Sequence, residues 1–218
     1  MKNILIITFL LNSFVLSAQS IPSIIFENLK NGAVLVRLKT NVNIINALKG
    51  KNDELMNRII VKRDEQNKEI INAFENNFTF CKVYYFYSDK SKDIAERKFK
   101  GNLLDADLNV VENLPELKDN YVIMEFSYIM QSTESTWSYS EWGIEDGKAQ
   151  MIDYYSGGTE KGPDALIVLM PDFRLMPDKY PYFVRTYEDL LFLERSKAKT
   201  VARMQNKIER YLEYAHSK

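Results

Sequence analysis

The sequence predicts an α/β fold, with an α+β arrangement as the alternative. Short apolar runs at 33–38 and 79–87 flank a long amphipathic stretch, which is the order of a βαβ unit with a right-handed crossover. From residue 120 onward the apolar residues alternate, as they do in antiparallel strands, and a last amphipathic helix closes the chain. The predicted architecture is therefore an N-terminal βαβ unit with a long helix, an antiparallel meander and a closing C-terminal helix.

The elements of the first half each have a local cause. Residues 33–38 are mostly apolar on both faces, as in the interior of a parallel sheet. Thr40 or Asn41 can cap the helix that follows, whose apolar residues recur at spacings of three and four over about 42–77. Gly50 and the polar stretch at 62–68 are the points where this helix can bend or split in two. The other expectations are an aromatic, β-branched strand at 79–87, a turn at Ser88-Asp89, a short helix at 91–98 and a brief strand at 103–104.

The sequence pattern of the second half predicts strands and turns. Residues 121–130 and 136–144 alternate in polarity, and we expect them to pair as neighbouring antiparallel strands. Asp146-Gly147 is a strong tight-turn signal. The remaining predictions are strands at 148–155, 165–170 and 182–185, and a helix from the capping-box pair Thr186 and Asp189 to about residue 215.

Residues 1–20 have the pattern of a secretory signal peptide. Lys2 precedes an apolar run from Ile4 to Leu11, and the small residues Ser17, Ala18 and Ser20 follow. The run is shorter than the roughly 20 residues that a spanning helix needs. We therefore expect residues 1–20 to be removed and 21–218 to form a single soluble globular domain. The expected location is the periplasm, the cell surface or the medium.

Composition disfavours several classes of function. The chain has 29 basic and 30 acidic residues, so no electrostatic footprint for nucleic acid stands out. No second apolar run approaches membrane-spanning length, and we expect no membrane insertion after signal cleavage. Cys81 and His216 are the only cysteine and histidine, which disfavours chemistry based on thiols, imidazole or zinc. We therefore expect no cofactor. Cys81 falls within an aromatic strand, where we expect its thiol to pack as a small hydrophobic group.

Three stretches resemble an uncharacterised family of exported proteins from Bacteroidetes-type bacteria. They are Asn31-Gly32-Ala33-Val34-Leu35-Val36-Arg37-Leu38-Lys39, Phe80-Cys81-Lys82-Val83-Tyr84-Tyr85-Phe86-Tyr87-Ser88 and Tyr180-Pro181-Tyr182-Phe183-Val184-Arg185-Thr186. The resemblance spans most of the mature chain and implies one continuous domain. It implies no activity, because none is assigned to the family.

One segment has the spacing of a calcium loop. Asp105, Asp107 and Asn109 occupy alternate positions, and Glu116 is twelfth counted from Asp105. The sixth position, where such loops need glycine, is Val110. We therefore interpret this segment as an acidic surface loop and predict no metal site. A calcium-binding loop is the alternative interpretation.

Polar residues follow the two parallel strands at their carboxyl ends, where ligands bind in open parallel sheets. The candidate binding residues at this edge, which we call the rim, are Lys39, Thr40, Ser88 and Asp89. Tyr155, Gly157 and Gly158 are candidates to join it, because glycine allows close approach of the backbone. The alternative is structural, with Thr40 capping a helix and Ser88-Asp89 forming a turn.

The function that these observations favour is non-catalytic binding of a partner or small polar ligand outside the cytoplasm. The expected partners are an envelope protein, a glycan or a small polar molecule. One alternative is a carboxylate-dependent hydrolase of glycans or cell-wall material. The chain has enough acidic residues for this chemistry, but the sequence does not identify which two would form a catalytic pair. A second alternative is a structural subunit of an envelope assembly.

Overall fold

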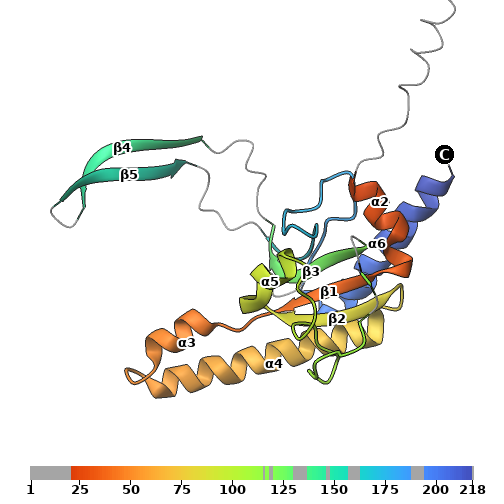
Figure 1. Cartoon of the computed structure of the whole chain (residues 1–218), viewed down its shortest axis with the longest axis horizontal. Coiled ribbons are helices and arrows are strands. Elements are labelled where there is room, and N and C mark those ends of the chain that lie inside the picture. The colour runs from red at the N-terminus through yellow and green to blue at the C-terminus, as the bar shows by residue number, and fades with distance from the viewer. Residues whose placement is uncertain are drawn as a thin grey trace, which may run out of the picture.

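The computed structural model describes residues 21–114, 116–117, 120–129, 137–145, 148–156, 163–187 and 194–217. The predicted signal peptide lies outside this range. The main body is a five-stranded mixed sheet with the order β2-β1-β3-β6-β7. Figure 1 labels the first three of these strands, β2, β1 and β3. Its strands are β1 (Ala33–Leu38), β2 (Lys82–Tyr87), β3 (Tyr121–Tyr128), β6 (Asp164–Leu169) and β7 (Phe183–Arg185). The predicted α/β class is confirmed.

The helices lie before, between and after the strands. They are α2 (Ile21–Asn28), α3 (Val42–Leu48), α4 (Asp53–Asn77), α5 (Ser91–Ala95) and α6 (Lys197–His216), with short 3-10 turns η1 (Leu29–Asn31) and η2 (Ser88–Lys90). No helix in the described part of the chain combines the length and apolar character needed to cross a membrane.

The predicted βαβ unit is present. β1 pairs with β2 in parallel, and α3 and α4 connect them. The long predicted helix is split at Gly50, whose φ is +71°, and Asn52 then caps α4 by accepting a hydrogen bond from the Leu55 N–H at 3.0 Å. The polar stretch after residue 62 does not interrupt α4. Leu104, where a brief strand was expected, makes isolated bridges to Tyr85 and Val110.

β3 takes different partners from those that the alternating pattern predicts. It pairs in parallel with β1 and antiparallel with β6, whereas β4 (Trp137–Glu145) and β5 (Lys148–Ser156) form a separate two-stranded antiparallel sheet. The expected pairing of 121–130 with 136–144 is therefore wrong. The reason is burial, because Tyr121–Met124 are covered on both faces, which an interior position beside β1 provides.

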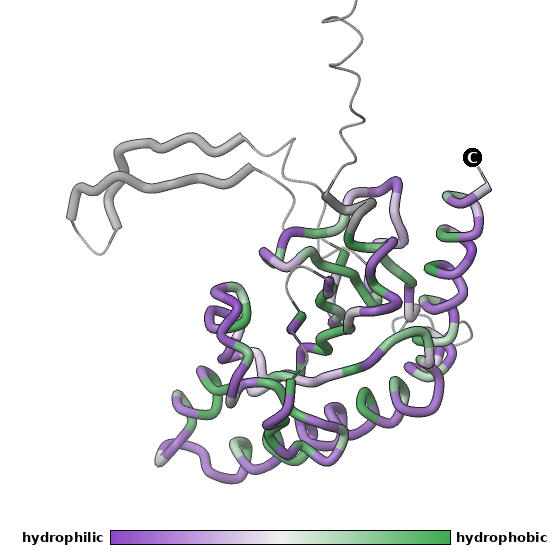
Figure 2. The backbone as a smooth tube through the Cα atoms, turned by 45° about the vertical axis from the view of Figure 1, so that its right-hand side comes forward, coloured by the Kyte–Doolittle hydropathy of each residue, from purple (hydrophilic) through white to green (hydrophobic). Residues whose placement is uncertain are grey.

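Both faces of the five-stranded sheet are covered. The face formed by Val34, Val36 and their neighbours packs against α2, α4 and α6. The opposite face, with Leu35 and Ile123, packs against α5 and the connection that leads from β2 to β3. Figure 2 shows green stretches gathered in the interior of the body and helices along which purple and green residues alternate.

The C-terminal helix begins later than predicted. The Thr186 N–H continues the pairing of β7 by donating to the Asp164 carbonyl at 2.9 Å, and α6 does not begin at Thr186. α6 starts at Lys197, where Ser196 Oγ accepts from the Lys199 N–H at 3.3 Å. Leu190 and Leu191, expected on its apolar side, lie outside the described residues, whereas Val201 and Ile208 are fully buried there.

Candidate functional site

The structure brings two of the four rim residues into contact. β1 and β2 end together, with Leu38 opposite Tyr87. Just beyond them, Thr40 Oγ1 lies 2.9 Å from Ser88 Oγ, and the Thr40 N–H donates to the same oxygen at 3.2 Å. The convergence follows from the parallel pairing, because parallel strands place their carboxyl ends at the same edge.

The polar groups of the rim are largely used within the protein. Buried Asn67 of α4 accepts from the Lys39 N–H at 3.1 Å and donates to the Lys39 carbonyl at 2.8 Å. Arg63 donates to the Thr40 carbonyl at 3.0 Å. Asn41, not Thr40, is the residue before α3, and its side chain makes no capping bond. These bonds tie the ends of the strands to α4 and leave few rim groups for a ligand.

An ion pair lies next to the rim in the sheet. Arg37 of β1 donates through Nη1 to Glu125 of β3 at 2.7 Å and through Nε to Ser91 Oγ at 3.0 Å. Its guanidinium also lies 5.8 Å from the centre of the Phe173 ring. Because both charged side chains are at most 30% exposed and already paired, they act as a structural link between β1, β3 and α5.

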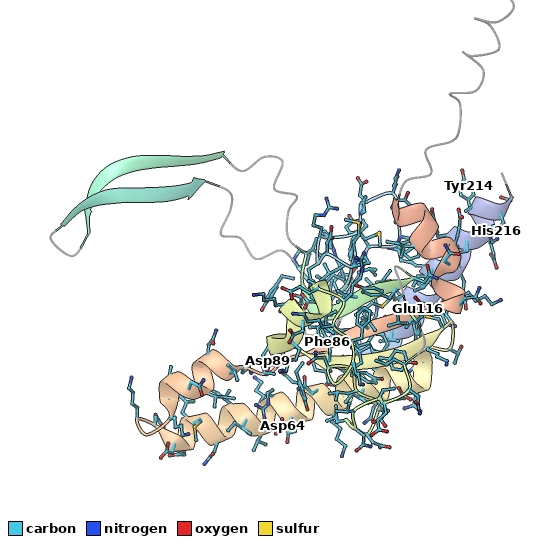
Figure 3. The ribbon with its side chains drawn as sticks, in the orientation of Figure 1. Asp64, Phe86, Asp89, Glu116, Tyr214 and His216 are labelled. Carbon is cyan, nitrogen blue, oxygen red and sulfur yellow. The ribbon has the colours of Figure 1, made fainter. Side chains whose placement is uncertain are left out.

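The other rim candidates do not join this contact in the described residues. Lys39 and Asp89 are exposed, and Asp89 lies in η2. Tyr155 belongs to β5, in the separate two-stranded sheet, and Gly157 and Gly158 lie outside the described residues. Figure 3 shows Asp89 near Phe86 and far from Tyr214 and His216 at the end of α6.

The segment with calcium-loop spacing forms a self-bonded turn. The Asp105 carboxylate accepts hydrogen bonds from the N–H groups of Asp107 at 3.0 Å and Asn109 at 2.9 Å. An aspartate that bonds the backbone two residues onward is typical of an Asx turn. Among the described residues there is no group of three or more histidine, cysteine or acidic side chains arranged to hold a metal ion.

Cys81 is half-buried and directly precedes β2, one residue outside the strand in which it was expected. Burial raises the pKa of its thiol to about 12, although a hydrogen bond with the backbone of Val34 opposes the rise. The thiolate is the reactive form of cysteine, so such a thiol is poorly nucleophilic at neutral pH.

We expect Cys81 to react slowly with a maleimide at pH 8 in the folded protein and rapidly in denaturant. With a pKa near 12, only about one thiol in ten thousand is ionised at that pH, against roughly a quarter for an ordinary cysteine. The measurement is a labelling time course followed by mass spectrometry. Equal rates with and without denaturant would contradict the shielding of this thiol.

A cleft of about 600 Å³ lies between the outer edge of the sheet and α6. Its volume falls in the range of small-molecule sites. Five of its lining side chains are cationic. The lining residues are Phe183, Val184, Arg185, Tyr187, Arg195, Arg203, Asn206, Lys207 and Arg210. We call this site the cationic cleft.

The helix geometry explains why three of these cations meet. Arg203, Lys207 and Arg210 are four and three residues apart, so they project from one side of α6. The buried side of the same helix, with Val201, Met204 and Ile208, packs on the sheet.

The five cations of the cleft make no ion pair within the described part of the chain. Some basic groups elsewhere do pair, as Arg37 does with Glu125 at 2.7 Å and Arg174 with Asp172 at 2.6 Å. No acidic residue lines the cleft among the residues described. Among the described residues the site is therefore a local concentration of positive charge without a paired acid, in a chain whose overall charge is near zero.

Two aromatic rings lie against cations of the cleft. The Arg195 guanidinium lies 5.1 Å from the centre of the Tyr187 ring, and the Lys207 ammonium lies 5.0 Å from that of Phe183. Such contacts are attractive because the ring face is electronegative. Partial burial of this ammonium lowers the pKa of Lys207. An anion beside it would favour the protonated form and offset that cost.

Only part of this cleft could be predicted from the sequence. The spacing of Arg203, Lys207 and Arg210 on an amphipathic helix marks a basic side, but such sides are usually solvated surface. Arg185 and Arg195 are separated from them along the chain. Only the packing of α6 beside β7 brings the two groups together.

Comparisons of the chain with protein-family models, with curated proteins and with solved structures found no match.

Proposed function

We propose that this protein is an exported, non-catalytic binding protein whose ligand is anionic and occupies the cationic cleft. The observation that carries the proposal is the set of five cations around one concave site with no ion-pair partner among the described residues. Like charges held together repel one another, and a bound anion relieves that repulsion.

The chemistry of the cleft supports binding over catalysis. Four of its five cations are arginines, which stay protonated at any physiological pH and neither accept nor release protons during a reaction. Their planar forks fit carboxylate and phosphate oxygens in pairs. Export is supported by the signal-like pattern of residues 1–20.

The test is thermal unfolding with anionic probes, since a ligand that binds only the native state raises the melting temperature. Suitable probes are phosphate, citrate, tripolyphosphate and hexaglutamate, with sucrose as the uncharged control. We expect at least one anion to raise the melting temperature of the wild type. The rise should be lost in the cleft variant Arg203→Glu/Arg210→Glu.

Two control variants make this result specific. Arg58→Glu/Lys68→Glu introduces the same change of charge on the exposed side of α4, and it should keep the full anion response. Lys39→Ala/Asp89→Ala removes the charges of the rim and should also keep it. Loss of the response in the rim variant but not in the cleft variant would move the site to the rim. No response to any anion in the wild type would overturn the proposal.

A further inference from the structure

The main-chain groups of Phe183 and Arg185 lie on the outer edge of β7 and point toward the cationic cleft. β7 is the last strand of the sheet and pairs antiparallel with β6. On either side of Val184, the Val168 N–H donates to the Tyr182 carbonyl and the Thr186 N–H to the Asp164 carbonyl. Because main-chain groups alternate in direction along an antiparallel strand, those of Phe183 and Arg185 point away from β6.

Both acceptors on this edge are already occupied by cations of the cleft. Lys207 Nζ donates to the Phe183 carbonyl at 2.9 Å, and Arg195 Nη1 donates to the Arg185 carbonyl. In the described part of the chain, the edge therefore offers a ligand the N–H donors of Phe183 and Arg185. These N–H groups and the guanidinium groups around them are all hydrogen-bond donors. β7 therefore presents no free main-chain acceptor to the cleft.

We infer that the ligand of the cationic cleft is a compact, multiply charged oxyanion rather than an acidic polypeptide strand added to β7. The inference rests on the proposed function. An added strand needs alternating donors and acceptors, so it would have to displace Lys207 and Arg195 from their carbonyls. Phosphoryl, sulfate or clustered carboxylate oxygens only accept hydrogen bonds, which matches a site built of donors.

The distribution of charge argues for a compact ligand. The chain has nearly equal numbers of basic and acidic residues, 29 and 30, so the positive charge of the cleft is local. A long polyanion draws its affinity from an extended basic track. A cleft of about 600 Å³ holding five cations matches a small ligand with several charges.

The experiment is isothermal titration of the full chain, without its signal peptide, with tripolyphosphate, acetate and acetylated hexaglutamate. We expect tripolyphosphate to bind at least tenfold more tightly than either of the others, and Lys207→Met or Arg195→Ala to weaken it by at least tenfold. In ¹⁵N-labelled protein, the amide resonances of Phe183 and Arg185 should shift on titration. Arg58→Ala, which also removes one positive charge but from exposed α4, serves as the matched control and should bind as the wild type does.

The outcomes separate this inference from the proposed function. Tighter binding of hexaglutamate than of tripolyphosphate, still lost in Arg203→Glu/Arg210→Glu, would overturn the oxyanion ligand and keep the anionic cleft. Absence of cleft-dependent binding by any probe would overturn both. Sedimentation with phosphatidylcholine vesicles that contain phosphatidic acid, reversed by tripolyphosphate, would support the oxyanion and assign it to a lipid headgroup.

Discussion

Deletion of residues 197–218 is expected to abolish cooperative unfolding. α6 covers one face of the sheet with Val201, Met204 and Ile208, all fully buried. Its Tyr211 ring packs on Phe26 of α2, with the ring centres 5.5 Å apart. Without α6 this apolar surface is exposed to water, which leaves a collapsed chain with poorly defined packing.

The measurement is urea denaturation followed by both far- and near-ultraviolet circular dichroism. Full-length protein should show one transition with both signals, whereas the truncated chain should show a broad far-ultraviolet change and little near-ultraviolet signal. A truncated protein that unfolds with the full-length midpoint and slope would make α6 dispensable to the core.

A single substitution tests the same packing without removing the helix. Ile208→Ala deletes a fully buried side chain and is expected to lower the free energy of unfolding by about 2–5 kcal/mol. Tyr214→Ala is the matched control on the same helix, because Tyr214 is 59% exposed, and it should change stability by less than about 1 kcal/mol. Equal effects of the two substitutions would contradict the burial of Ile208.

Gly32→Ala is expected to be the most damaging single-atom change in the sheet. A Cβ built on Gly32 would lie 1.7 Å from the carbonyl oxygen of Asn120. That oxygen accepts the Ala33 N–H at 3.1 Å, at the point where β1 and β3 begin to pair. The backbone must move apart to admit the methyl group, and we expect a loss of more than about 3 kcal/mol of folding stability.

Gly50→Ala is the control for this substitution. Gly50 has a φ of +71°, and a Cβ added there would meet no atom within 4 Å, so alanine introduces backbone strain but no clash. That strain costs about 1–2 kcal/mol. Chemical denaturation of the two variants should rank Gly32→Ala as clearly the less stable. The reverse order would show that β1 and β3 do not approach as closely as described.

Local sequence pattern determined most of the elements in this protein. The apolar run at 33–38 and the aromatic run before Ser88 became the parallel pair β1 and β2, because each run matches what a buried strand requires. Gly50 predicted the break between α3 and α4, since its left-handed conformation ends a helix at little cost. The meeting of Thr40 and Ser88 at the rim followed from the same parallel pairing.

The tertiary structure decided what lies far apart in the chain. An alternating pattern marks 121–128 as a strand, but the choice of β1 and β6 as its partners depends on which surfaces need covering. α6 begins at Lys197, after the cap Ser196, whereas the Thr186 N–H continues the pairing with β6. The cationic cleft depends on the same packing, since Arg185 and Arg195 meet the basic side of α6 only after β7 takes its place at the edge of the sheet. Sequence periodicity reports a residue's neighbours within one element, whereas a site made of two elements exists only once they pack.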